Sequence, residues 1–316
     1  MGNSNLRKAA KAKNDEFYTL LEDIELELKH YDLSGKVVYC NCDDPHKSNF
    51  VKYFIDNFNE LGINRLYATH YTPDEGLLCK NDEKPNFMLE YDGSYKYSVL
   101  LGDGDFRSDE CVDILKRCDV VVTNPPFSLF REFVTQLVDY NKHFLIIGNQ
   151  NAITYKEVFP LLRDDKMWLG YNIVKQFIVN ASNSSRLNKG VEWNAEQKCY
   201  IAKFGNICWF TNLEHNKINE KITLTKKYNK IDYPKYDNYD AINVDRVNDI
   251  PYDYKGYMGV PITFMNKYNR NQFKIYGIMN TGEENIGIRL PNTKHGRPVI
   301  NGLEKYLRII IKRNGE

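Results

Sequence analysis

The stretch DVVVTNPPFSLFREFVTQLVDYNKHFLIIGN, which runs from Asp119 to Asn149, holds two apolar runs separated by a helical pattern. The first run stops at Asn124, and the second occupies residues 143–149. Both are short, rich in β-branched or aromatic residues, and apolar on both faces, as strands of a covered parallel sheet are. Residues 130–140 between them have helical spacing. The stretch therefore predicts a β-α-β unit.

The same alternation continues on both sides of this unit. Further strands are predicted at residues 36–41, 65–71, 97–102, 166–171 and 206–213, and further helices at residues 50–61, 108–117 and 155–163. Ser108 is a plausible helix cap. This pattern predicts an α/β domain with a doubly wound parallel sheet. After residue 213 the chain becomes rich in Asn, Tyr and Lys and loses its periodicity, so we expect two domains, residues 1–213 and residues 214–316. An Asn/Ser-rich segment, residues 180–190, is expected to be an exposed loop within an insertion at about residues 171–205.

Composition limits the possible function. The chain has 316 residues, is 42% hydrophobic and has a net charge of +1. No apolar run is long enough for a membrane span, and the N-terminus has no secretory signal, so we expect a cytoplasmic protein. The seven cysteines and six histidines show no ligand spacing, which indicates reduced thiols and no metal site. From Thr211 onward, 18 Lys and Arg stand against 12 Asp and Glu. This basic excess is either ordinary surface charge or a surface for nucleic acid.

Ligands of open α/β sheets bind beyond the carboxyl ends of the strands. The segments there are CNCDDP, GDGDF, NPPF and GNQN. In NPPF, two prolines fix the backbone after Asn124 and can direct the Asn124 side-chain oxygen and the Pro125 carbonyl at one point. Two such acceptors suit an amine with two hydrogens, and Phe127 offers a face for a flat heterocycle. The amine could then attack an electrophilic methyl group, with its developing positive charge stabilised. The alternative is a turn with only a structural role.

Six segments together resemble one family. DEFYT, VVYCNCDDP, GDGDFRS, VVTNPPFSLFRE, YPKYDNYDAINV and MGVPITF are similar to motifs of the EcoRI-type adenine-specific DNA methyltransferases, and the resemblance extends from about Lys13 to Phe264. It implies a Rossmann-like, S-adenosylmethionine-dependent methyltransferase sheet with helices on both faces, plus a smaller C-terminal target-recognition region. It also implies a monomeric enzyme that methylates N6 of a flipped-out adenine within a short duplex DNA sequence.

The resemblance also implies roles for individual residues. The catalytic turn is Asn124, Pro125, Pro126 and Phe127. Phe17 and Tyr18 would border the methionine end of S-adenosylmethionine, and Asn41, Cys42 and Asp43 would lie near its amino acid part. The Asp105 carboxylate would accept from the cofactor adenine's amine, and the Phe106 backbone N–H would reach a ring nitrogen. CNCDDP lacks the glycines usual in related cofactor loops.

The basic C-terminal part provides candidate contacts to double-stranded DNA, where Lys and Arg hold phosphates. The candidates are Lys226, Lys227, Lys235, Tyr236, Tyr239 and Arg246. A partner restriction endonuclease acting on the same site, in a bacterium or phage, would fit this reading. Two alternatives stay open: an RNA adenine or protein glutamine N-methyltransferase, and a catalytically silent DNA-binding protein on the same frame.

Overall fold

The computed structural model describes residues 18–71, 87–179, 191–195, 198–280, 288–290 and 296–315. The chain forms two compact units. The first unit comprises Met1–Glu157 with Gly170–His215, and the second comprises Val158–Leu169 with Asn216–Glu316. The second unit is therefore discontinuous in sequence.

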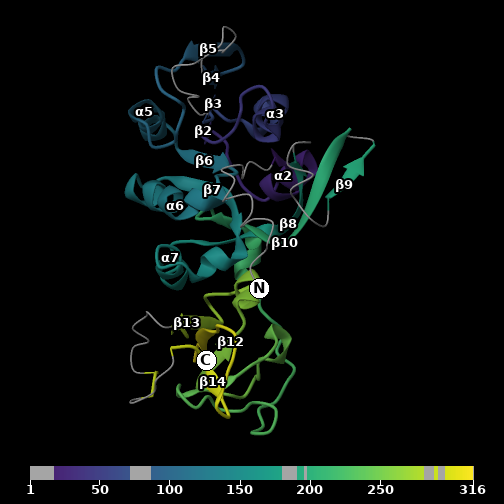
Figure 1. The fold of residues 1–316 in the computed structure, drawn as a ribbon, viewed down its shortest axis with the longest axis vertical. Coiled ribbons are helices and arrows are strands. Elements are labelled where there is room, and N and C mark those ends of the chain that lie inside the picture. The colour runs from purple at the N-terminus through teal and green to yellow at the C-terminus, as the bar shows by residue number, and fades with distance from the viewer. Residues whose placement is uncertain are drawn as a thin grey trace. The chain divides into compact units, whose positions relative to one another are not determined.

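A ten-stranded mixed sheet forms the framework of the first unit (Figure 1). Its strands lie side by side in the order β1-β8-β10-β7-β6-β2-β3-β4-β5, and β9 pairs with β10. Their bounds are β1 Tyr18–Thr19, β2 Val37–Cys40, β3 Arg65–Ala68, β4 Phe87–Tyr91, β5 Tyr95–Val99, β6 Val120–Thr123, β7 His143–Asn149, β8 Trp168–Val179, β9 Val191–Asn194 and β10 Cys199–Thr211. The four central strands β7, β6, β2 and β3 are parallel to one another, and the pairings toward both edges are antiparallel.

Helices cover the two faces of this sheet. α2 (Leu21–Leu28) and α3 (Asn49–Asp56) lie on one side, and α5 (Asp109–Arg117) and α6 (Phe130–Asp139) lie on the other (Figure 1). The short α4 (Phe58–Leu61) follows α3, and the 3₁₀ turns η1 (Phe127–Leu129) and η2 (Gln150–Thr154) follow β6 and β7. The predicted cap of α5 is confirmed, because the Ser108 hydroxyl accepts from the Cys111 backbone N–H at 3.3 Å.

Close packing fixes the start of α6, which directly follows the NPPF segment and η1. A Cβ atom on Gly148 of β7 would lie 2.5 Å from the Phe130 ring, so only glycine allows the first residue of α6 to pack there. Phe130 also packs on Phe210 of β10, with ring centroids 5.2 Å apart. The start of α6, and with it the preceding NPPF segment, is thus held against the centre of the sheet.

The strands predicted at residues 36–41, 65–71, 119–124 and 143–149 are confirmed as β2, β3, β6 and β7. The prediction of a further parallel strand at residues 97–102 is wrong. The strand there is β5, an antiparallel edge strand whose five side chains are all exposed, and its hairpin partner β4 was not predicted. The run YSVLLG is apolar enough for a core strand, but it ends the sheet, where one side of the strand has no neighbour.

The region expected to be an insertion, residues 171–205, instead largely continues the sheet. β8 and β10 are long strands, and β9 pairs antiparallel with β10. The loop predicted at residues 180–190 lies outside the described residues.

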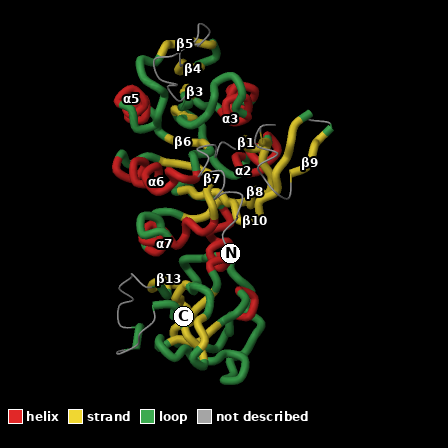
Figure 2. Tube along the Cα trace, in the orientation of Figure 1, coloured by secondary structure: helices red, strands yellow, loops and turns green. Residues whose placement is uncertain are grey.

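The second unit has a four-stranded sheet in the order β11-β12-β16-β13 (Figure 2). Its strands are β11 Ala241–Asn243, β12 Tyr257–Val260, β13 Phe273–Ile278 and β16 Ile309–Arg313. A separate two-stranded sheet is formed by the hairpin of β14 (Val299–Ile300) and β15 (Leu303–Glu304). The remaining elements are α7 (Phe159–Arg163) and the turns η3 (Asn216–Asn219), η4 (Val247–Asp249) and η5 (Ile262–Lys267).

The segment Val158–Leu169 is an integral part of this second unit. Phe159 and Leu162 of α7 are fully buried, and α7 packs against β13. The Tyr268 hydroxyl donates to Asp165 at 3.1 Å, and the Arg270 guanidinium lies 5.8 Å from the centre of the Trp168 ring.

Candidate functional site

The NPPF segment follows β6 at the carboxyl end of the central parallel strands. Asn124 directly follows Thr123, the last residue of β6, and its Oδ1 atom is shielded from solvent. Pro125 is buried, and Pro126 has φ −57° and ψ 123° before the chain enters η1. The turn thus holds an amide oxygen in a protected position at the ligand edge of the sheet, as the sequence predicts.

Phe127, the last residue of the motif, is only partly buried. It packs against the hydrophobic core of the first unit and meets Phe177 of β8 edge to face, with centroids 6.4 Å apart. Core packing on one edge fixes the orientation of the ring, and its partial exposure leaves room for a further contact.

Asn41 immediately follows β2, next to β6 in the sheet, and its side chain is 2% exposed. Its Oδ1 atom is buried and has no hydrogen-bond partner among the described residues. A buried acceptor without a donor costs about 1–3 kcal/mol, so a donor supplied by a ligand would stabilise this arrangement. The ammonium group of S-adenosylmethionine is such a donor, and the site therefore fits this cofactor.

Asp43, two residues later, uses both carboxylate oxygens within the protein. Oδ1 accepts from the Ser48 hydroxyl at 2.6 Å, and Oδ2 accepts from the Thr123 hydroxyl. Its backbone N–H donates to the Thr69 carbonyl at 2.9 Å. Burial raises the pKa of Asp43 to about 6, although the two hydroxyl donors oppose the shift.

This raised pKa predicts a pH-dependent stability. An unfolded Asp loses its proton near 3.8, whereas folded Asp43 keeps it to about 6. Between these values the folded state binds more protons, so its stability falls as pH rises. Asp43→Asn removes this pH dependence. The free energy of unfolding of the variant minus that of wild type should therefore increase as pH rises from about pH 4.5 to about pH 6.5, when both proteins are measured by urea unfolding.

Asp113→Asn is the control for this measurement. Lys116 lowers the pKa of the exposed Asp113, so its titration lies below that pH range and the variant should show no trend there. A flat difference for Asp43→Asn as well would contradict the assigned pKa.

The GDGDF segment approaches the same edge of the sheet from β5. Gly104 has φ +75°, and a Cβ atom there would lie 2.0 Å from the His70 carbonyl oxygen, just beyond β3. Glycine therefore lets the loop cross close to the end of β3. Phe106 is buried against Phe133 of α6, and its carbonyl accepts from the Gln136 side chain at 3.1 Å.

Asp105 carries a partner that the sequence did not predict. Arg107 donates from its backbone and side chain to the Asp105 carboxylate, with the shortest contact at 2.6 Å, and lowers the pKa of Asp105. Arg107 also contacts Glu132 of α6 at 2.8 Å. The loop is thereby joined to the helix that follows the NPPF segment.

The N-terminal motif reaches the sheet through β1. Phe17 lies outside the described residues. Tyr18 and Thr19 pair with β8, and the Thr19 carbonyl accepts from the Asn49 side chain at 2.7 Å, at the start of α3. The Thr19 hydroxyl is buried without a hydrogen-bond partner among the described residues. Sequence reasoning missed Thr19, although it is the last letter of DEFYT.

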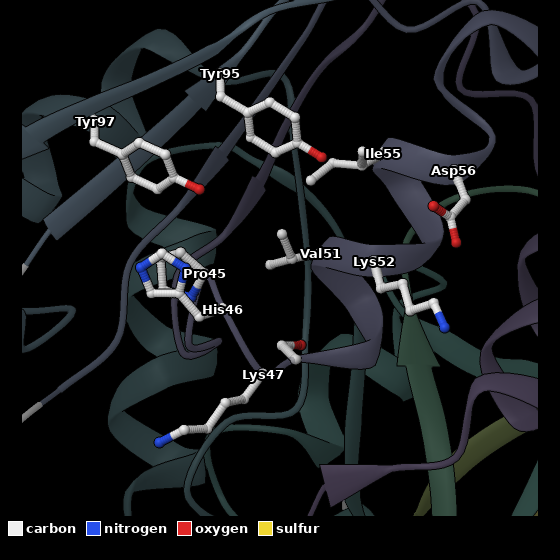
Figure 3. Close-up of a pocket in the computed structure, with 10 residues that line it drawn as sticks. Pro45, His46, Lys47, Val51, Lys52, Ile55, Asp56, Tyr95 and Tyr97 are labelled. Carbon is white, nitrogen blue, oxygen red and sulfur yellow. The ribbon is translucent and has the colours of Figure 1, made fainter.

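A hollow of about 290 Å³ lies between α3 and β5 (Figure 3). Tyr95 and Tyr97 line it from β5, His46 and Lys47 line it from the segment before α3, and Lys52 lines it from α3. Pro45, the last residue of CNCDDP, and Ser48 also line it, whereas the predicted catalytic and cofactor residues of the described chain do not.

The predicted DNA contacts divide into two groups. The basic side chains are exposed on the second unit, and they are Lys226, Lys227, Lys235 and Arg246. The assignment is wrong for Tyr236 and Tyr239, which are 3% and 0% exposed and belong to a hydrophobic core. Their hydroxyls donate inward, to Asn243 and to the Gly296 carbonyl. A ring in a core cannot contact DNA.

Two features are absent from the described part of the chain. No group of three or more His, Cys, Asp or Glu residues in the described ranges could hold a metal ion. Similarly, none of the described helices is long and apolar enough to cross a membrane.

Comparison with known proteins adds independent information. The sequence model of the family described as "Adenine-specific methyltransferase EcoRI" matches residues 5–314. The chain is 45% identical to the Type II methyltransferase M.EcoRI of Escherichia coli over 98% of this chain and 96% of that protein. It is 37% identical to the Type II methyltransferase M.MpnI of Mycoplasma pneumoniae, covering 97% of each. No solved structure gives a significant match.

Proposed function

The chain belongs to the EcoRI family of adenine-specific methyltransferases, and we propose that it transfers a methyl group from S-adenosylmethionine to N6 of a flipped-out adenine in a short duplex DNA sequence. The observation that carries the proposal is the Asn124 turn at the carboxyl end of β6, together with the buried acceptor on Asn41 at the carboxyl end of the neighbouring parallel strand β2. Both groups stand where open α/β sheets bind their ligands.

The Asn124 oxygen and the Pro125 carbonyl accept the two N–H groups of the target amine. They orient its lone pair toward the methyl group and stabilise the positive charge that develops on nitrogen. S-adenosylmethionine, when bound, supplies the electrophilic methyl group on a sulfonium. The methylated nitrogen would then release one proton to solvent, which restores a neutral amine.

The proposed cofactor residues of the chain fall into three groups. Asn41 accepts from the ammonium group, Tyr18 borders the methionine end, and Asp105 with the Phe106 backbone holds the adenine. Asp105 keeps a lone-pair position for the adenine amine beside its pair with Arg107, because each carboxylate oxygen accepts more than one hydrogen bond. The parallel pairing of β7, β6, β2 and β3 supports this placement.

The second unit, with Lys226, Lys227, Lys235 and Arg246 exposed on it, is the proposed target-recognition region. The proposal also includes a monomer in the cytoplasm of a bacterium or an infecting phage, and a restriction endonuclease that cuts the same unmodified site.

The decisive experiment is expression in a host without adenine methylation, followed by sequencing that detects N6-methyladenine. One short motif modified throughout the genome is expected. Soluble protein that binds S-adenosylmethionine but leaves the genome unmodified would reject DNA as the substrate. Transfer of labelled methyl groups to RNA or protein would then identify the alternative.

The exposed lysines provide a separate prediction. Lys226→Ala combined with Lys227→Ala should weaken DNA binding and reduce the slope of log K against log salt by about one per lost phosphate contact. Fluorescence anisotropy across a salt series measures the slope. Lys36→Ala is the control. Lys36 is exposed and directly precedes β2, whereas Asn41 directly follows it, so the two residues lie at opposite ends of this strand. Equal slopes for the double variant and the control would remove the two lysines from the DNA surface.

A further inference from the structure

Thr123 is the last residue of β6 and directly precedes Asn124. Its side chain is fully buried, and its hydroxyl donates to the Asp43 carboxylate. The two residues are 80 positions apart in sequence. Successive side chains of a strand point to opposite faces, so the rotation of the strand at Thr123 sets the direction in which Asn124 leaves it.

The backbone alone does not fix this part of β6 against β2. The ladder between the two strands pairs Val38 with Val120 and Tyr39 with Val121. Beyond Val121, β6 pairs with β7 on its other side, up to Thr123 with Ile146. The bond from Thr123 to Asp43 therefore connects the catalytic turn to the β2 loop after the ladder between them has ended.

Asp43 is itself held at several points. Ser48, which donates to the other carboxylate oxygen, caps α3 by accepting from the Phe50 backbone N–H at 3.0 Å. The Asp43 backbone N–H bonds to Thr69, and the Thr69 backbone N–H bonds to the Cys40 carbonyl at 3.1 Å. The backbone of Asp43 is thus bonded to the segment after β3, and its carboxylate is bonded to the cap of α3. A buried, fully bonded carboxylate of this kind is well suited to orient a neighbour.

We propose that Asp43 is a positioning residue for methyl transfer, which acts through the Thr123 hydroxyl to hold Asn124 in its catalytic orientation. The proposal rests on the function proposed above. It assigns Asp43 to the positioning of Asn124 instead of to contact with the amino acid part of the cofactor. Both of its carboxylate oxygens serve the protein, so Asp43 contributes to the rate of transfer more than to cofactor affinity.

The test uses Thr123→Val, which keeps the shape of the side chain and removes the hydroxyl. The single-turnover rate of methyl transfer to duplex DNA should fall about 100-fold, as expected for a small misplacement of a catalytic group. The dissociation constant for S-adenosylmethionine, measured by calorimetry, should change little. Thr123→Ser restores the hydroxyl and should restore most of the rate.

Tyr39→Phe is the matched control. It removes another buried side-chain hydrogen bond at the same sheet edge, from Tyr39 to Thr69 at 2.7 Å, without touching the catalytic turn. Its rate should stay close to wild type. A wild-type rate in Thr123→Val would overturn the proposal, and so would a loss of rate matched by an equal loss of cofactor affinity.

A second readout does not depend on activity. With ¹⁵N-labelled asparagine, the Asn124 side-chain amide signals are assigned by their disappearance in Asn124→Ala. They should shift in Thr123→Val and keep their positions in Tyr39→Phe. If the wild-type protein transfers no methyl group to DNA, the proposed function fails, whereas unchanged Asn124 signals in Thr123→Val would reject the coupling itself.

Discussion

Asn124→Ala should lower the single-turnover rate of methyl transfer by about 100- to 1000-fold while leaving the affinity for duplex DNA nearly unchanged. The alanine variant lacks the oxygen that accepts from the target amine, so the developing positive charge on nitrogen loses one of its two acceptors. The side chain contacts the reacting group rather than the DNA backbone, which explains why binding should survive. Transfer of a tritiated methyl group measures the rate, and fluorescence anisotropy measures DNA affinity.

Two further variants make this result specific. Asn124→Asp retains an acceptor oxygen and should be more active than the alanine variant. Asn64→Ala is a control, because Asn64 directly precedes β3, at the amino ends of the parallel strands, and its side chain donates to the Gly35 carbonyl at 2.7 Å. It should retain most of the activity. Full activity in Asn124→Ala would exclude the mechanism.

Gly104→Ala should weaken the binding of S-adenosylmethionine by about 10- to 100-fold, which corresponds to about 1.5–3 kcal/mol. The left-handed conformation costs an L-residue about 1–2 kcal/mol, and the new methyl group would lie 2.0 Å from the His70 carbonyl oxygen. The loop must therefore move away from the end of β3. Asp105 and Phe106 follow immediately and would lose their proposed hydrogen bonds to the cofactor adenine.

Gly102→Ala is the control in the same loop. A Cβ atom there would meet only the end of the Glu110 side chain, at 3.3 Å, and the backbone is not in the left-handed region. Calorimetric titration should therefore give nearly wild-type affinity for Gly102→Ala. Equal affinities for the two variants would indicate that this loop does not hold the cofactor.

The central strands could be predicted from sequence because burial on both faces leaves a continuous apolar run. The strand predicted at residues 143–149 has those bounds in the structure. The same criterion failed at β5, where Tyr97, Ser98 and Val99 of the apolar run are exposed at the sheet edge. The helix α2 was not predicted either, although Leu21, Ile24 and Leu28 recur at helical spacing along LEDIELEL.

Residues of the candidate site that belong to a sequence motif could be predicted. Pairs of residues that are far apart in sequence and meet only in the folded chain could not. NPPF marks Asn124, but nothing local pairs Thr123 with Asp43 or Arg107 with Glu132. Tyrosine is a particular difficulty, because its ring suits a core as well as a surface. Tyr239 follows a run of turns and lysines, yet it is fully buried.

The discontinuity of the second unit has a consequence for protein engineering. A fragment beginning at residue 216 would lack α7, whose buried Phe159 and Leu162 pack on the β13 side of that unit, and would expose apolar surface to water. A chimera that exchanges this unit between relatives therefore needs three crossover points, one at each end of Val158–Leu169 and one before Asn216. A single crossover near residue 213 would join an α7 from one parent to a β13 from the other, and their side chains would have to be matched by repacking.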